Sequence, residues 1–209
     1  MDFASTGTEG LDDILGGGLP RGHLYLVEGD PGAGKTTLGL RFLMEGAKRG
    51  ERALYITLSE SEEELREVAT SHEWSLEGVD VFELKASEQG ASADLSLFHP
   101  SEVDLSEVMK TVLGEVARVK PSRVVFDSLS VSYVADTVIL TRYFEAGGQV
   151  RNALSVVKKR SGAHEKTIRE FTLSRGGIRL GAPLDKFQGV LTGVPRYAGG
   201  ATDLLDDDG

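Results

Sequence analysis

The most chemically specific segment of the sequence runs from Gly29 to Thr36 and reads G-D-P-G-A-G-K-T. Glycines at this spacing let a loop wrap so that successive backbone N–H groups converge on phosphate oxygens. We expect Lys35 to reach the β- and γ-phosphates of a nucleotide and the Thr36 hydroxyl to bind Mg²⁺. A chance glycine-rich turn is the alternative. The residues predicted to hold the nucleotide are Gly29, Asp30, Pro31, Gly32, Ala33, Gly34, Lys35, Thr36 and Thr37.

Acidic residues follow two strand-like segments, where ligands bind in parallel α/β sheets. Asp127 comes directly after the apolar run Val124–Phe126. We interpret it as the acidic residue that helps to hold Mg²⁺, with an ordinary turn residue as the alternative. Glu60 follows the segment Ala53–Leu58. We interpret it as the group that orients or deprotonates a water molecule beside the γ-phosphate, with a surface charge at a helix entry as the alternative.

The elements that must position these residues alternate between strand and helix patterns, which predicts a three-layer α/β fold around a mainly parallel sheet. After Asp127, short strand patterns joined by glycine-containing turns predict an antiparallel extension. The expected strands are Leu24–Val27, Ala53–Leu58, Val79–Leu84, Val124–Phe126, Asp136–Leu140, Asn152–Lys158, Ile168–Leu173 and Ile178–Leu180. The expected helices run from Lys35 to about Lys48, from Ser61 to Ser71, and from Asp104 to a stop before Pro121, with Lys85–Val103 as a loop between elements.

Length and composition indicate a single domain over residues 1–200 and an acidic, disordered tail over 201–209. The chain has 209 residues, 40% of them hydrophobic and 27% charged, and it has no cysteine, which excludes disulfide scaffolds and cysteine metal sites. No apolar run is long enough to span a membrane, and the first residues lack a secretory signal pattern, so we expect a cytoplasmic protein without a membrane partner. The net charge of −10 disfavours binding to nucleic acid.

Taken together and in order, these segments resemble the KaiC-like group of RecA-superfamily ATPases, to which RadA-like proteins are related. The matching segments are Ser5–Asp12, Leu15–Gly22, the loop from Gly29 to Thr36, Tyr55–Glu60, Val124–Ser128, Ala135–Leu140, Val156–Gly162 and Pro183–Gly193. The resemblance implies a Mg²⁺-dependent ATPase that forms a hexamer with ATP between subunits. Some family members also phosphorylate their own Ser or Thr residues, but no such site is identifiable in this sequence.

The resemblance also implies roles for three basic or titratable residues near the end of the chain. Lys158 and Arg160 would reach the γ-phosphate bound to a neighbouring subunit, and His164 would lie near that neighbour's nucleotide sugar. Arg suits such a role because its planar guanidinium neutralises phosphate charge in the transition state. An exposed basic strand end is the alternative. The residues predicted to act in catalysis are thus Glu60, Lys35, Lys158 and Arg160.

The sequence departs from the family pattern at two places. Ser59 stands where the family has the first of two adjacent acidic residues. The link Ser128–Ala135 is too short for the helix–strand unit that the family carries there, because a parallel crossover needs a dozen or more residues. We interpret this as an internal deletion of a helix–strand unit, or a fusion of two family segments, that removes the strand expected between the phosphate-loop strand and the Asp127 strand. Either Asp136–Leu140 fills that place or the sheet closes differently.

Two other functions remain open. The first is a nucleotide-binding scaffold or signalling module with little turnover, which works through a signalling protein partner. It fits a chain that has lost part of its sheet, because small displacements of catalytic groups lower the rate by large factors. A RadA-like, DNA-stimulated ATPase is the other, although the acidic balance and the lack of a basic, aromatic-rich loop argue against it.

Overall fold

The computed structural model describes residues 2–84, 105–127, 135–160, 162–174, 176–190 and 196–198, with backbone alone for residues 105–108. Several predicted features lie outside these ranges. They are the loop Lys85–Val103, the helix cap at Asp104, most of the link Ser128–Ala135 and the acidic tail 201–209. The α/β class predicted from the alternating patterns is confirmed in the described part of the chain.

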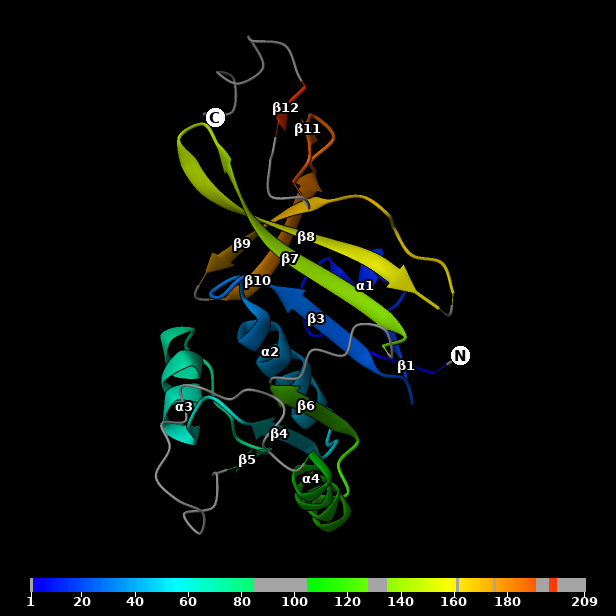
Figure 1. Cartoon of the computed structure of the whole chain (residues 1–209), viewed down its shortest axis with the longest axis vertical. Helices are drawn as coiled ribbons and strands as arrows, with labels where there is room; N and C mark the ends of the chain where they lie inside the picture. Colours follow the sequence, from blue (N-terminus) through cyan, green and yellow to red (C-terminus); the bar gives the residue numbers. More distant parts are fainter. Residues whose placement is uncertain are drawn as a thin grey trace.

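A three-stranded parallel sheet forms one half of the molecule, with β4 (Ala53–Thr57) between β5 (Val79–Glu83) and β6 (Arg123–Asp127). All β4 residues are buried because helices cover both faces of the sheet (Figure 1). Successive strand residues point to opposite faces. Tyr55 accordingly packs in a cluster with α2 (Lys35–Lys48) and α3 (Glu62–Ser71), whereas Leu54 and Ile56 pack against α4 (Leu105–Val119). This half therefore has three layers.

A five-stranded sheet forms the other half, in the order β10-β9-β8-β7-β3. Only β3 and β7 are parallel, and the remaining pairs are antiparallel, which confirms the predicted antiparallel extension. Its core contains residues of α1 (Leu11–Ile14) and α2. The strands are β3 (Tyr25–Gly29), β7 (Thr137–Ala146), β8 (Gln149–Lys159), β9 (Arg169–Ser174) and β10 (Gly177–Pro183); β1 (Phe3–Ala4) with β2 (Leu19–Pro20) and β11 (Phe187–Gln188) with β12 (Arg196–Tyr197) form separate two-stranded pairs.

The two sheets are not joined by hydrogen bonds between strands of the described ranges. On the described part of the chain, β3 pairs only with β7 and β6 pairs only with β4. The strand that begins at Thr137 lies between β3 and β8, so it does not fill a place beside β6. Val124 of β6 is 41% exposed, whereas every β4 residue is buried. Of the two arrangements left open by the sequence, the structure shows the second, in which the parallel strands are divided between two sheets.

Nearby residues in the sequence set where the helices begin and end, and the structure confirms two of the predicted ends. The helix α2 begins after Gly34, whose φ of 82° gives the left-handed turn into the helix, and it ends at Lys48 as predicted. Ser61 and Glu64 form a capping box at the start of α3. In α4, Val112 packs against the sheet while Leu113 is 59% exposed.

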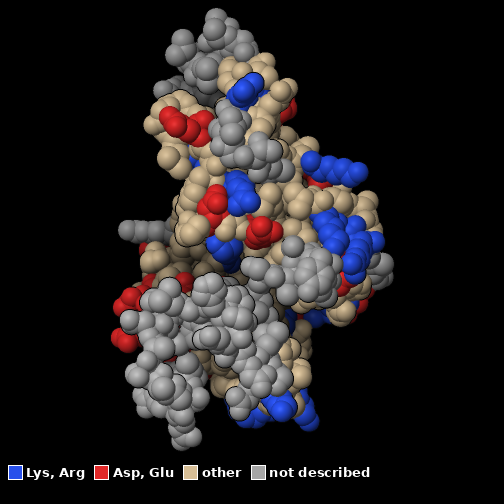
Figure 2. Space-filling view, viewed as in Figure 1, with Lys and Arg blue, Asp and Glu red and all other residues tan. Residues whose placement is uncertain are grey.

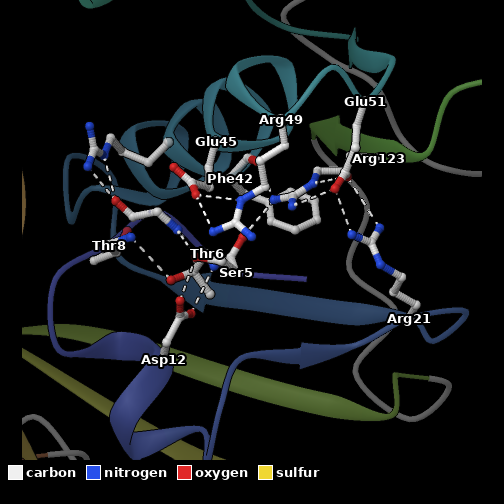
Figure 3. Close-up of polar contacts among 12 residues, drawn as sticks. Ser5, Thr6, Thr8, Asp12, Arg21, Phe42, Glu45, Arg49, Glu51 and Arg123 are labelled. Carbon is white, nitrogen blue, oxygen red and sulfur yellow. Dashed lines mark hydrogen bonds and ion pairs between the residues drawn. The ribbon is translucent and has the colours of Figure 1, made fainter. Parts of the chain in front are cut away.

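An ion-pair network ties the N-terminal segment, α2 and β6 together (Figure 3). The Arg123 side chain is fully buried; its Nε donates to Glu51 Oε2 at 2.7 Å, and its Nη1 donates to the carbonyl oxygens of Ser5 at 2.6 Å and Phe42 at 2.8 Å. Its guanidinium lies 4.7 Å from the centre of the Phe42 ring. Arg21 forms a second ion pair with Glu51 at 2.7 Å. Hydrogen bonds from Arg123 and then Arg21 lower the pKa of Glu51 to about 2.

In the described ranges, no helix is both long enough and apolar enough to cross a membrane.

Candidate functional site

The glycine-rich loop connects the end of β3 to the start of α2, as the sequence predicts. Ala33 N donates to the Asp30 carbonyl at 3.1 Å, which closes a turn within the loop. A side chain at Gly29 would overlap Thr141 Oγ1 of the adjacent strand β7, so only glycine allows the two strands to approach this closely. The loop therefore presents its backbone at the N-terminus of α2, where N–H groups and the helix dipole favour an anion.

Basic side chains lie directly on this loop. Lys35 Nζ donates to the carbonyls of Gly29 at 2.9 Å and Asp30 at 2.8 Å. Arg142 of β7 forms an ion pair with the Asp30 carboxylate at 3.1 Å. Thr36 is partly buried beside Lys35, and Thr37 is buried. The loop thus carries an ammonium group and a hydroxyl group next to the converging N–H groups that would hold a phosphate.

Glu60 is held in a tight turn after β4. The Thr57 Oγ1 accepts from the backbone N–H of Glu60 at 2.9 Å and donates to the Glu60 carbonyl at 2.8 Å. Oε2 of Glu60 is buried, and among the described residues no hydrogen-bond partner reaches it. Burial raises the pKa of Glu60, the nearby Asp127 and Glu64 raise it further, and Lys35 opposes them. Within the described ranges, Glu60 is therefore a carboxylate with a buried acceptor atom that no donor reaches and with a raised pKa.

Asp127 lies at the end of β6, and a tyrosine holds its carboxylate. The Tyr55 hydroxyl donates to Asp127 Oδ2 at 2.8 Å. Burial raises the pKa of Tyr55, and the negative charge of Asp127 raises it further. The Thr36 hydroxyl lowers this pKa by a smaller amount. The structure thus brings together four of the residues predicted for catalysis and metal binding, Lys35, Thr36, Glu60 and Asp127.

The donor set of this group fits a magnesium ion bound together with a nucleotide. Within the described ranges no three His, Asp or Glu side chains are placed to hold a metal by themselves. Mg²⁺ does not need such a cage, because in nucleotide sites it takes one or two protein oxygens and completes its shell with phosphate and water. The Thr36 hydroxyl and the Asp127 carboxylate offer such oxygens, and the unpartnered Glu60 Oε2 can accept from a water molecule beside them.

Three predicted residues lie away from the loop of their own chain. Lys158 pairs with Val138 in the β7–β8 register, whereas Gly29 lies beside Thr141, three residues further along β7 and therefore about 10 Å away at the rise of a strand. Arg160 forms an ion pair with Asp136 at 3.4 Å, and His164 is partly buried in the segment after β8. Figure 2 shows Lys and Arg side chains gathered at the end of β8. These residues do not join the nucleotide loop within one chain.

Sequence reasoning missed the residues that orient the predicted ones. Tyr55 had a detectable signal, because a tyrosine in an otherwise apolar buried strand usually finds a hydrogen-bond partner for its hydroxyl. Thr57 precedes Glu60 by three residues, a spacing typical of hydroxyl groups that bond to nearby backbone. Arg142 had no such signal, since its position beside Asp30 depends on the pairing of β3 with β7.

Comparison with known proteins places the chain in a family. A family model described as "ATPase: KaiC" matches residues 4–133. The circadian clock oscillator proteins KaiC of Picosynechococcus sp. and of Thermostichus vulcanus are each 28% identical over 239 residues, which cover 91% of this chain and 45% of the relative. The circadian clock protein KaiC3 of Synechocystis sp. is 28% identical over 241 residues, with 92% and 46% covered.

The chain spans about half the length of these curated relatives. Each alignment is also longer than the 209 residues of the chain, so the relatives contain residues without a counterpart in it. The family model covers more than half of the chain and includes the glycine-rich loop, Glu60 and Asp127. The chain therefore belongs to the KaiC family of ATPases.

Proposed function

We propose that this chain binds ATP with Mg²⁺ and hydrolyses it, with the nucleotide held by the loop from Gly29 to Thr36. One observation carries the proposal of hydrolysis rather than binding alone. Glu60 lies in the turn after β4 and combines a buried carboxylate oxygen, which has no hydrogen-bond partner among the described residues, with proximity to Asp127 and Lys35. A carboxylate in that setting is suited to accept a proton from water.

In the proposed reaction, the residues of the chain bind, orient and exchange a proton. The backbone N–H groups of the loop and Lys35 hold the β- and γ-phosphates, while Thr36 and Asp127 hold the metal. A bound Mg²⁺ supplies neutralisation of phosphate charge. Glu60 orients a water molecule and takes its proton as the water oxygen bonds to the γ-phosphorus and the bond to the ADP oxygen breaks. The raised pKa of Glu60 makes it a better base than an exposed glutamate.

We further propose that hydrolysis takes place at the interface of a homohexamer. Lys158 lies about 10 Å along the sheet from the end of β3 where the loop begins, and Arg160 lies two residues further on, so both suit a role on a neighbouring subunit, to which we also assign His164. Arg160 is 55% exposed, which leaves it accessible to such a neighbour. A head-to-tail ring joins two different surfaces of identical subunits, as this arrangement requires.

The divided sheet favours a second candidate function, a nucleotide-binding module with little turnover that serves a signalling partner. We propose that the division reflects an internal deletion of the strand expected between β3 and β6. Backbone binding of phosphate at the loop needs only β3 and α2, which are present. Hydrolysis also needs Asp127 and Glu60 in register with the loop, and β6 has no strand contact with β3 in the described part of the chain.

Steady-state phosphate release and ATP binding by calorimetry separate these candidates. We expect Lys35→Ala to weaken ATP binding strongly, because it removes the ammonium at the loop. We expect Glu60→Gln to lower turnover by about 10²-fold or more while the dissociation constant for ATP changes less than about threefold. Glu63→Gln, an exposed glutamate in the first turn of α3, is the matched control and should leave both unchanged.

The outcomes are distinct. Native turnover equal to that of Glu60→Gln, with ATP still bound, contradicts hydrolysis and supports the nucleotide-binding module. Absence of ATP binding by the native chain with Mg²⁺ present contradicts both candidates.

A further inference from the structure

The phenol of Tyr55 lies at the contact between the two halves of the site. Tyr55 is fully buried in β4, and its ring packs in the same cluster as α2 residues. A side-chain atom added at Gly39 of α2 would meet Val125 of β6 at 3.2 Å and the Tyr55 ring at 3.8 Å, which shows how closely the helix, the strand and the ring approach one another. The tyrosine hydroxyl points to the end of β6, where it donates to Asp127 Oδ2 at 2.8 Å.

The two oxygens offered to a metal, the Thr36 hydroxyl and an Asp127 carboxylate oxygen, belong to segments that follow or end strands of different sheets. Thr36 stands in the first turn of α2, directly after the loop that follows β3, and Asp127 ends β6. In the described part of the chain no strand hydrogen bonds run between β3 and β6, so strand pairing does not set the distance between Thr36 and Asp127. The Tyr55 hydroxyl donates to Asp127 from the strand beside β6, so this hydrogen bond is a contact that fixes the carboxylate.

We propose that Tyr55 is a positioning residue, whose hydroxyl fixes the orientation of the Asp127 carboxylate and so sets how strongly Mg²⁺ binds with the nucleotide. The inference rests on the proposed function. A hydrogen bond to a charged acceptor fixes both the rotation of the carboxylate and its distance from the phenol. A carboxylate that rotates away presents its oxygen to the metal for only a fraction of the time, and metal affinity falls by that fraction. A buried phenol that merely satisfies its own hydrogen bond would leave metal affinity unchanged.

The test measures the affinity of the chain for ADP by calorimetry, in EDTA and in saturating Mg²⁺, so that no turnover is involved. For Tyr55→Phe we expect the dissociation constant in EDTA to stay within about twofold of the native value. The increase in ADP affinity on adding Mg²⁺ should fall by about tenfold, because only the metal-dependent part depends on Asp127. Tyr25→Phe is the matched control, since the Tyr25 hydroxyl donates to the Pro20 carbonyl, away from the loop, and should change neither value.

A double-mutant cycle distinguishes positioning from a general loss of stability. If Tyr55 acts through Asp127, then Asp127→Asn lowers the Mg²⁺ effect and adding Tyr55→Phe lowers it little further. Additive losses contradict the proposal. Binding of Mn²⁺ to the ADP complex, followed by electron paramagnetic resonance, provides an independent readout and should weaken by a similar factor in Tyr55→Phe and stay unchanged in Tyr25→Phe.

Folding of the variant is checked by urea unfolding. Should Tyr55→Phe not fold, the native sequence labelled with 3-fluorotyrosine replaces it, and substitution of the other four tyrosines one at a time (Tyr25→Phe, Tyr133→Phe, Tyr143→Phe and Tyr197→Phe) assigns the remaining resonance to Tyr55. We expect the Tyr55 fluorine resonance of the ADP complex to move on adding Mg²⁺, and not to move in Asp127→Asn. A resonance that ignores Mg²⁺ overturns the inference.

Failure of the inference and failure of the proposed function are separable. A native chain that shows the Mg²⁺ effect, together with a Tyr55→Phe variant that retains it in full, overturns the role of Tyr55 alone. A native chain that binds ADP no more tightly with Mg²⁺ overturns both.

Discussion

A fully buried arginine is costly unless its charge is paired and its N–H groups are all bonded. Arg123 has its charge paired with Glu51 and donates to two backbone carbonyls, and Glu51 is bonded in turn by Arg21. The network joins residues more than seventy positions apart in the sequence (Figure 3). Because β6 ends in Asp127, the same network that fixes the start of β6 also contributes to the position of the proposed metal ligand.

We predict that Glu51→Gln lowers the free energy of unfolding by about 2–3 kcal/mol at pH 7, because it leaves the buried Arg123 without its counter-charge. The pKa of Glu51 falls from 4.5 in the unfolded chain to about 2 in the fold. A lowered pKa stabilises the fold fully above the unfolded value, and this contribution is lost as pH falls toward the folded value. The difference between native and variant should therefore be largest above pH 4.5 and shrink between pH 4.5 and 2 in urea titrations.

Glu62→Gln is the control for this prediction. Glu62 forms an exposed ion pair with Arg66, with side chains 43% and 54% exposed, and such pairs contribute about 0–1 kcal/mol. A Glu51 variant as stable as the native chain at neutral pH would contradict a structural role for the network.

Among the elements, α2 has the most demanding position. It begins at the nucleotide loop and packs against strands of both sheets, so it joins the two halves where strand pairing does not. Its interior contains Gly39 and Gly46, although glycine is a poor helix former. Both lie where a β-carbon would meet a neighbour: Val125 at 3.2 Å for Gly39, and the Arg123 Cδ at 2.5 Å for Gly46. Close approach of β6, rather than helix propensity, accounts for these glycines.

We predict opposite effects for the same substitution in two helices. Gly46→Ala should destabilise the fold by about 1–3 kcal/mol, because the new methyl group displaces a buried arginine and the strain outweighs the gain in helix propensity. Gly114→Ala in α4 should stabilise it by up to about 1 kcal/mol, since Gly114 is exposed and no atom of the described part of the chain lies within 4 Å of the added methyl group. Thermal and urea unfolding measure both. Stabilisation by Gly46→Ala would show that β6 does not press against α2 as described.

At the scale of the whole molecule, the five-stranded sheet has the nucleotide loop toward one end of its strands and basic side chains toward the other. The nucleotide loop follows β3, whose last residue lies beside Thr141 of β7, whereas Lys158 pairs near the start of β7 and Arg160 forms an ion pair with Asp136 just before it. A single subunit cannot bring these ends together without breaking the pairing of β7 with β8. If both ends act on one nucleotide, the loop of one subunit must therefore meet the basic residues of the next subunit.

We predict that Arg160 acts on the nucleotide of a neighbouring subunit. Arg160→Ala should lower turnover while leaving nucleotide affinity of the isolated subunit unchanged, and Lys35→Ala should lack turnover because it does not bind ATP. Mixing the two variants should restore part of the activity, because an intact loop then meets an intact arginine across an interface. Phosphate release from the mixture measures this.

Arg49→Ala is the matched control for the mixing experiment, because Arg49 is 54% exposed and paired with a carboxylate of its own chain, much as Arg160 is 55% exposed and paired with Asp136. The control should retain native turnover. A mixture no more active than its parts, or a mass measurement showing only monomers in ATP, contradicts action across an interface.

Local chemistry determined much of this protein. The nucleotide loop, the bounds of α2, the capping box of α3 and the order of strands and helices depend on residues that are close in the sequence, and each was predictable from it. The common sheet edge that the sequence predicted accounts only for Glu60 and Asp127, which follow the paired strands β4 and β6, because Lys35 and Thr36 follow β3 of the other sheet.

The tertiary structure alone decided what depends on distant partners. The bond from Tyr55 to Asp127 joins residues 72 positions apart, and the strand partner of β7 was one of two arrangements that the sequence left open. The pairing of strands also decides the surroundings of two predicted residues. It sets which groups can reach Glu60 Oε2 and places Arg160 beside Asp136 of its own chain. Sequence patterns report the periodicity and chemistry of each segment, but the pairing of strands is chosen by packing across the whole chain, and no short segment contains that information.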